Sequence, residues 1–204
     1  MNTWALFTIG YIICVVLTFI PTFKAIIRKV KLHPGGQSFE KSPHFSNEGK
    51  ELLIQHYSRL QGTLIFWKNQ AEKYRNFHYY CLCWTIPSSL IIPILIQGMS
   101  SENFDSSNLL VTIISSHTAL LLAFHSGFKV DNNFKAFRHG ESEFYDLYRR
   151  LLDRPSSFGI DESTQIQAYF TEVESIRKFI RNAETDNMPS IEDGKLSKNN
   201  TTSI

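Results

Sequence analysis

Charged side chains are missing from three stretches of this chain. No Asp, Glu, Lys or Arg occurs in residues 4–23, 79–99 or 109–128. A helix needs about 20 mostly apolar residues to cross a ~30 Å hydrocarbon core, so each stretch is long enough to span a bilayer. Only a polar loop at 100–108 separates the second stretch from the third. We therefore expect an all-α membrane protein with a transmembrane helical hairpin. The two spans of the hairpin cover 79–99 and 109–128, and the lipid bilayer is an expected partner.

Other absences exclude several function classes. The chain has no P-loop, no G-x-G-x-x-G turn and no H-E-x-x-H helix, so the familiar phosphate loops and the zinc-hydrolase pattern are missing. Its three cysteines belong to no set of ligands with zinc spacing. A net charge of only +2 gives no general basis for binding nucleic acid. We expect no enzyme activity, no catalytic residue, no metal, no cofactor and no nucleic-acid partner.

The first uncharged stretch is followed at once by a basic flank. The Lys and Arg residues of 24–31 come after the apolar run, whereas a cleaved signal peptide carries its basic residues before that run. We interpret residues 1–31 as an uncleaved N-terminal transmembrane anchor. The alternative is an apolar segment that lies in the membrane interface or packs on the hairpin.

The flanks of the three stretches indicate one orientation. Lys and Arg are abundant in residues 24–75 and follow the third stretch at Lys129 and Lys135, whereas the loop at 100–108 carries only acidic charges. Cytoplasmic loops carry the excess of Lys and Arg in membrane proteins. The expected protein is a multi-pass protein of the inner (plasma) membrane, with its N-terminus outside and its C-terminus in the cytoplasm.

Heptad patterns flank the hairpin on both sides. Leu60, Leu64 and Trp67 belong to a stripe that steps by three and four residues and keeps one helix face apolar. Phe137 and Phe144 belong to a similar stripe after the hairpin. These five residues predict a seam between helices, either within one chain or between copies. The first stripe runs into the hairpin, so one long helix is expected from about 47 to 97.

Glu141 interrupts the second stripe at a position that is otherwise apolar. It has two interpretations. It marks a charged contact with a neighbouring helix, or it lies at the solvated edge of the seam, which is the commoner position for a charged residue.

Proline, glycine and helix-capping residues divide the rest of the chain into segments. Residues 32–45 hold two prolines and two glycines and form a linker, and Ser46 is a suitable cap for the helix that follows. A helical module is expected over 46–185, with cytoplasmic helices at about 47–78, 129–153 and 162–185. The second of these ends at Arg154, because the residue before a proline is disfavoured in the α region. The tail at 186–204 has no apolar stripe and should be disordered.

Polar side chains interrupt the spans. The third uncharged stretch carries five candidate pore-lining residues: Thr112, Ser115, Ser116, His117 and His125. Intramembrane polar groups usually face other helices or water. They therefore line a polar passage, or they bond nearby carbonyls and pack between helices. Pro87 and Pro93 in the preceding span are candidate kink or gate positions, although such breaks also serve packing alone.

Residues 46–183 together resemble a SLATT domain, a two-transmembrane effector family of bacterial conflict systems. The resemblance lies in an aromatic and Ala-x-x-Tyr stretch, a second span that carries polar residues, and a basic and aromatic helix after it. The residues that carry it are Trp67, Ala71, Tyr74, Arg138, Glu141, Tyr145 and Arg149. The family has no catalytic residues, and the resemblance implies a membrane-perturbing or pore-forming effector. The N-terminal stretch lies outside the core family pattern.

These observations lead to one main functional hypothesis and two alternatives. The main one is an oligomeric inner-membrane effector that forms a pore or disrupts the membrane on a signal in a bacterial antiphage or conflict system. A homo-oligomer is required because two or three spans cannot enclose a water path. An upstream sensor or a nucleotide second messenger is a possible partner. The alternatives are a constitutive ion channel or small transporter, and a membrane scaffold that recruits a cytoplasmic partner.

Overall fold

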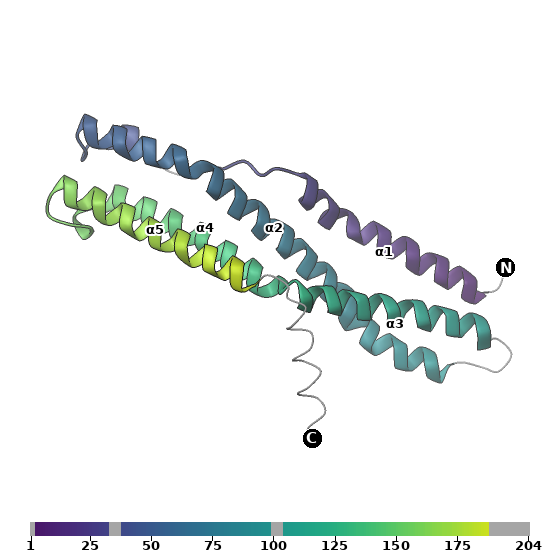
Figure 1. The fold of residues 1–204 in the computed structure, drawn as a ribbon. Helices are drawn as coiled ribbons and strands as arrows, with labels where there is room; N and C mark the ends of the chain where they lie inside the picture. Colours follow the sequence, from purple (N-terminus) through teal and green to yellow (C-terminus); the bar gives the residue numbers. More distant parts are fainter. Residues whose placement is uncertain (1–2, 33–37, 99–103, 188–204) are drawn as a thin grey trace, which may run out of the picture. The chain divides into compact units, whose positions relative to one another are not determined.

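The computed structural model describes residues 3–32, 38–98 and 104–187 of the chain. The elements are α1 (Thr3–Ile27), η1 (Phe39–Lys41), α2 (Asn47–Gln97), α3 (Phe104–Gly127), α4 (Val130–Asp153), η3 (Pro155–Ser157) and α5 (Glu162–Asp186) (Figure 1). The described residues contain no strand, so the expected all-α class is confirmed.

Three of these helices are long and apolar enough to cross a membrane: α1, α2 and α3. An 18-residue window in each helix has a mean hydropathy of 2.2 in α1, 1.7 in α2 and 1.6 in α3. This confirms the coarse part of the sequence interpretation, namely an all-helical chain with three segments suited to a bilayer.

Local signals place most helix ends where the sequence predicts them. α2 is one helix over Asn47–Gln97, and the Ser46 Oγ caps it by accepting a hydrogen bond of 3.1 Å from the Gly49 N–H. α4 ends at Asp153, directly before Arg154 and its following proline.

The helix α3 begins earlier than the sequence predicts. The prediction extends the polar loop to residue 108, whereas α3 already begins at Phe104. Asp and Ser are favoured in the first turns of helices, so the residues after 104 support helix as well as loop. The predicted disordered tail lies almost wholly outside the described residues.

The chain divides into two compact units, which are described separately. Among the described residues, unit 1 comprises 3–28, 73–98 and 104–131, and unit 2 comprises 29–32, 38–72 and 132–187. α2 contributes its C-terminal half to unit 1 and its N-terminal half to unit 2.

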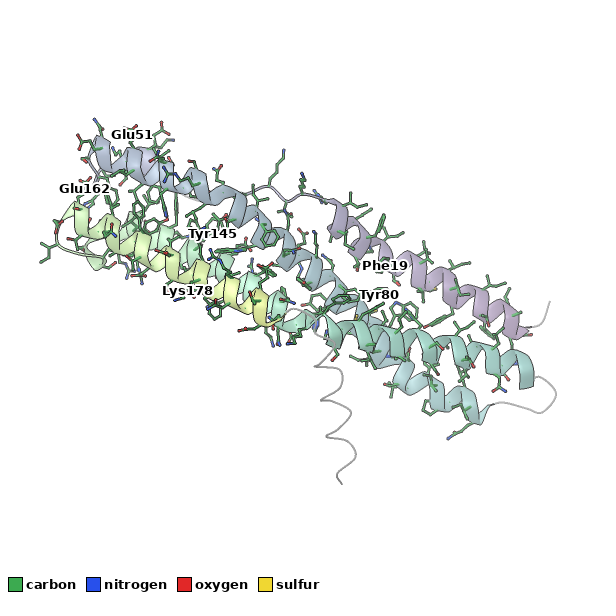
Figure 2. The ribbon with its side chains drawn as sticks, in the orientation of Figure 1. Phe19, Glu51, Tyr80, Tyr145, Glu162 and Lys178 are labelled. Carbon is green, nitrogen blue, oxygen red and sulfur yellow. The ribbon has the colours of Figure 1, made fainter. Side chains whose placement is uncertain are left out.

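Unit 1 packs α1, α3 and the second half of α2 around a small aromatic core. The buried side chains of Tyr80, Cys81 and Leu121 form its centre, and Phe19 packs against them. Figure 2 shows Phe19 of α1 directed toward Tyr80 of α2, with ring centroids 5.1 Å apart. Most large apolar side chains of α1 point outward instead, including Leu6, Val16 and Leu17 at 57–60% exposure. The buried residues of α1 are Thr8, Thr22 and Ala25.

Unit 2 is a three-helix bundle of the first half of α2 with α4 and α5. Its interior is apolar and aromatic, because the stripes predicted from the sequence face one another. Gly140 allows α4 to approach α5 closely, since a Cβ there would lie 2.6 Å from the Ile180 side chain. The fully buried large side chains of the bundle include Leu53, Leu64, Phe137, Phe144, Leu151, Tyr169 and Ile180.

Part of the expected linker belongs to the core of unit 2. Phe39 is 2% exposed and packs on the ring of Tyr148, with centroids 4.5 Å apart. Phe45 is buried as well. The prolines and glycines of 32–45 correctly predict that this segment is not one continuous helix. The prediction of a linker missed the burial of Phe39 and Phe45.

Candidate functional site

His117 is the centre of a polar cluster inside unit 1. Its Nδ1 lies 2.7 Å from the hydroxyl oxygen of Tyr11 on α1, and its Nε2 lies 3.3 Å from the hydroxyl oxygen of Tyr80 on α2. Both ring nitrogens of this half-buried histidine therefore have a tyrosine partner, and the two partners come from different helices. A neutral imidazole donates from one nitrogen and accepts at the other, which suits two hydroxyl groups.

Aromatic rings and hydroxyl groups hold this cluster in place. The Trp84 ring packs edge-on against both Tyr11 and His117, with centroids 5.0 and 5.6 Å apart. The Trp84 Nε1–H donates to the Thr18 Oγ1 at 2.9 Å, which ties α2 to α1. Ser88, which is 3% exposed, lines the same small cavity as Tyr11. Three helices thus converge on one imidazole.

A second pair of histidines lies two turns farther along α3. The Nδ1 of His78 on α2 is 2.8 Å from the Nε2 of His125 on α3. One of these nitrogens carries the hydrogen and the other accepts it, since two bare nitrogens or two N–H groups would repel at this distance. Sequence reasoning identified His125 as polar and intramembrane but did not pair it with His78, because the pairing depends on how α2 and α3 pack.

The other predicted polar residues of α3 separate into two groups. Thr112 and Ser116 are exposed on the surface of unit 1, whereas Ser115 and His117 are half-buried. The Oγ1 of Thr118 is buried and has no hydrogen-bond partner among the described residues. The five pore-lining candidates therefore do not converge on one face.

The two candidate kink residues lie within the continuous helix α2. Pro87 lines a small apolar cavity of about 340 Å³ in unit 1 together with Tyr11 and Trp84. This cavity adjoins the His117 cluster through those two shared side chains. Pro93 does not line it.

All five predicted seam residues lie in the interior of unit 2. Leu60, Leu64, Trp67, Phe137 and Phe144 are 1–5% exposed within the single chain. Phe66 and Phe137 meet edge to face with centroids 5.7 Å apart, so α2 and α4 share this seam. The seam joins helices of one chain, and its side chains are already covered without a second copy.

The buried carboxylate of Glu141 forms ion pairs in that seam with two cations that are more exposed. Its side chain is 6% exposed, its Oε2 accepts from Arg138 at 2.8 Å, and its Oε1 lies 3.8 Å from the Lys68 Nζ on α2. The contact with a neighbouring helix is therefore observed, and the solvated-edge interpretation is wrong. The α4 stripe places Glu141 inward, and burial of a carboxylate requires a cation beside it.

Tyrosine hydroxyl groups are buried in unit 2, and that of Tyr145 lies near Glu141. Burial, with nearby Tyr57 and Glu141, raises the pKa of Tyr145 to about 12. Burial also strongly raises the pKa of Tyr169. Neither hydroxyl has a hydrogen-bond partner among the described residues.

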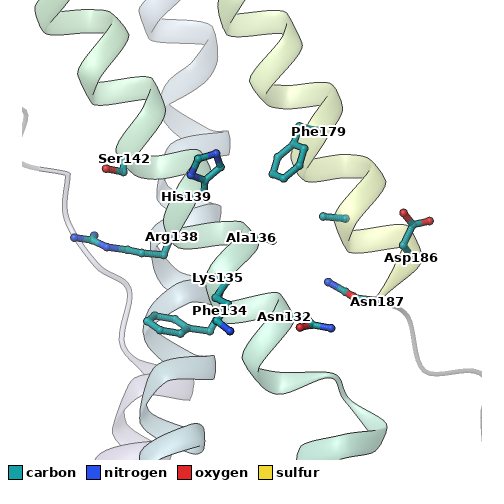
Figure 3. Close-up of a pocket in the computed structure, with 11 residues that line it drawn as sticks. Asn132, Phe134, Lys135, Ala136, Arg138, His139, Ser142, Phe179, Asp186 and Asn187 are labelled. Carbon is teal, nitrogen blue, oxygen red and sulfur yellow. The ribbon is translucent and has the colours of Figure 1, made fainter.

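A groove of about 750 Å³ lies between the start of α4 and the end of α5. Figure 3 shows His139 and Phe179 on opposite walls, and their rings meet edge-on at 5.6 Å. Arg138 extends away from α5 toward its contact with Glu141, and Asp186 lies at the rim. The groove therefore combines exposed rings with charges of both signs.

Within the described residues, no group of three or more His, Cys, Asp and Glu side chains could hold a metal ion. No family model, curated protein or solved structure matches the chain. Functional inference therefore depends on the geometry of the chain itself and on the resemblance described above.

Proposed function

We propose that this chain is an oligomeric effector of the inner membrane that permeabilises the bilayer on a signal. In this proposal α1, α3 and the second half of α2 cross the membrane, with the N-terminus outside and unit 2 in the cytoplasm. The resemblance to SLATT domains supports an effector of this kind, acting downstream of a sensor or a nucleotide second messenger.

The proposal is carried by a stripe of small side chains along α3. Thr112, Ser116, Ala119 and Ala123 step by four, three and four residues, and all four are exposed on the surface of unit 1. In lipid, helices associate through small residues that allow close approach, and Ser and Thr hydroxyl groups bond across the contact. We call these four residues the α3 stripe and assign them to the contact between copies.

The surface around the α3 stripe supports the same assignment. Leu109, Leu120 and Leu122 on α3 are 52–56% exposed, which suits acyl chains. Hydroxyl groups at Thr112 and Ser116 are costly against lipid and are satisfied by a second copy or by water. Several copies joined in this way enclose a polar path between them, which one chain does not provide.

The first experiment compares two neighbouring positions of α3 in bacterial cells. Ala123→Leu fills the α3 stripe with a larger side chain, whereas Phe124→Leu alters a position beside it that is 44% exposed. We expect the parent chain and Phe124→Leu to collapse the membrane potential when expressed at raised level. Ala123→Leu should reduce this effect roughly tenfold, because close helix approach is lost.

The readouts are a potential-sensitive dye, the amount of protein in the membrane fraction and cross-linking between copies. Cells that keep their potential while the parent chain accumulates in the membrane would contradict the proposal. An Ala123→Leu chain that depolarises cells as strongly as the parent would exclude the α3 stripe as the contact. Conduction by purified protein in liposomes without any signal would favour the constitutive channel.

A further inference from the structure

The basic segment that follows α1 is tied to α2 within unit 2. The Val30 N–H donates to the Asn69 Oδ1 at 2.7 Å, and both residues belong to unit 2. A backbone donor outside a helix is satisfied by water unless the protein supplies an acceptor, so this bond fixes where the segment runs. Lys29 and Lys31, on either side of Val30, are exposed. Their positions beside α2 are therefore set before any partner binds.

Two further cations lie next to this hydrogen bond, on α2 and α4. Lys68 directly precedes Asn69, and its Nζ lies 3.8 Å from the Glu141 Oε1. Arg138 donates to the other oxygen of the Glu141 carboxylate at 2.8 Å, while its side chain remains 62% exposed. A guanidinium has five N–H donors, so this one bond leaves others that face solvent. Glu141 thus holds two cations at the surface near Asn69.

The cations gather around one turn of α2 and come from three segments of the chain. The carboxylates beside them are Glu141, which is 6% exposed, and Glu72, which lies one turn farther along α2. Positive charge is therefore in excess on the exposed side. We call this surface the basic surface and define it by Lys29, Lys31, Lys68 and Arg138.

We propose that the basic surface binds the phosphate groups of anionic phospholipids in the cytoplasmic leaflet, an inference that rests on the membrane placement in the proposed function. Lys29 comes directly after Arg28, and α1, the first helix suited to a bilayer, ends at Ile27. Two residues of extended chain reach about 7 Å, which is roughly the depth of the headgroup layer. The basic surface therefore begins at the level of the lipid phosphates.

A lipid suits the basic surface better than a free anion does. Water and salt screen exposed cations, which therefore hold a soluble phosphate weakly. A lipid is kept at the surface by its acyl chains, and the charges of neighbouring anionic lipids add to the attraction. The hydrogen bond between Val30 and Asn69 strengthens the contact further, because the two lysines beside it are already ordered. This contact holds unit 2 at the cytoplasmic face.

The test uses the full chain, purified in a mild detergent and mixed with equal amounts of phosphatidylglycerol and phosphatidylcholine that carry the same acyl chains. Native mass spectrometry counts the molecules of each lipid that the protein retains, and neither a signal nor a pore is required. We expect the parent chain to retain the anionic lipid about fivefold more than the zwitterionic one. Added salt should reduce this preference.

Two double variants with equal net charge locate the contact. Lys29→Gln with Lys31→Gln should lower the preference for the anionic lipid about fivefold, to near equality. The control, Lys41→Gln with Lys50→Gln, removes the same charge from unit 2. Because Lys50 lies about 28 Å before Asn69 along the helix axis, the control should retain the preference of the parent.

Asn69→Ala tests whether the hydrogen bond to Val30 orders the basic surface. This change removes no charge, so a count of charges predicts no effect. We expect it to lower the preference about threefold, because the Val30 N–H loses its acceptor and the lysines beside it lose their fixed position. Equal elution and equal melting temperature of all variants in detergent establish that they are folded.

Equal retention of both lipids by the parent chain would overturn the inference. An equal loss of preference in the Lys41 and Lys50 control would do the same, because net charge alone would then account for binding. An unchanged preference in Asn69→Ala would exclude the ordered surface. Displacement of the anionic lipid by inorganic phosphate at matched concentration would identify a site for free anions instead.

This test fails separately from the test of the proposed function. A parent chain that prefers the anionic lipid but leaves the membrane potential of cells unchanged contradicts the permeabilising function alone. A parent chain that depolarises cells but retains both lipids equally contradicts the lipid-binding surface alone.

Discussion

The two units of this chain arrange similar residues in opposite ways. In unit 1 the buried positions of α1 are threonine and alanine, while leucine, isoleucine, valine and phenylalanine point outward. In unit 2 leucine and phenylalanine are buried, and the only buried carboxylate among its described residues is the paired Glu141. Apolar groups leave water for any apolar surroundings. The comparison supports the proposed placement, in which lipid surrounds unit 1 and water surrounds unit 2.

The same helix serves both arrangements. On α2, Leu52 and Leu53 belong to unit 2 and are 52% and 0% exposed, and Leu90 belongs to unit 1 and is 66% exposed. The same change, from leucine to aspartate, at each of these three positions therefore tests the burial of the side chain and the surroundings of the unit separately.

The largest effect is expected from Leu53→Asp. An aspartate at this fully buried position leaves an unpaired charge in the core of unit 2, which costs several kcal/mol or shifts the pKa of the new carboxyl far upward. The matched change Leu52→Asp places the same charge in water and should alter stability by less than about 1 kcal/mol. Thermal unfolding and limited proteolysis in mild detergent measure the difference, and equal behaviour of the two variants would contradict the observed register of α2.

The second effect is expected from Leu90→Asp, which tests the surroundings of unit 1. This leucine is more exposed than Leu52, so an aqueous environment predicts that aspartate is tolerated. In a bilayer the same change costs about 3 kcal/mol in insertion free energy. We expect Leu90→Asp, and not Leu52→Asp, to reduce the amount of protein in the membrane fraction. Tolerance of both changes would remove the difference between the units.

The smallest effect at neutral pH is expected from Tyr169→Phe in unit 2. Burial raises the pKa of Tyr169 above its value of about 10 in an unfolded chain. The folded state therefore retains this proton as the pH rises above about 10, whereas the unfolded state loses it, so the stability of the parent falls there. Tyr169→Phe should be nearly neutral at pH 7, because the hydroxyl has no partner among the described residues. It should also weaken the loss of stability between pH 10 and pH 11. Melting curves across this range provide the measurement, and an unchanged alkaline profile would refute it.

Particular residues show how far sequence reasoning reaches. The spacing of Leu60, Leu64 and Trp67 correctly places them on one buried helix face, and Ser46 caps α2 as its chemistry suggests. The partners of His117 could not be predicted, because Tyr11 is 106 residues away and no local rule links the two positions. The burial of Phe39 was missed for the same reason, since its partner Tyr148 lies on a distant helix.

The sequence alone determined the helices and the three stretches suited to a bilayer, because helix ends, hydrophobic length and charge depend on neighbouring residues. The tertiary structure alone decided which polar groups meet. It brought Tyr11 and Tyr80 to the two nitrogens of His117, paired His78 with His125, and left Thr112 and Ser116 on the surface. These outcomes depend on how helices pack against one another, and periodicity along one helix carries no information about the partner that faces it.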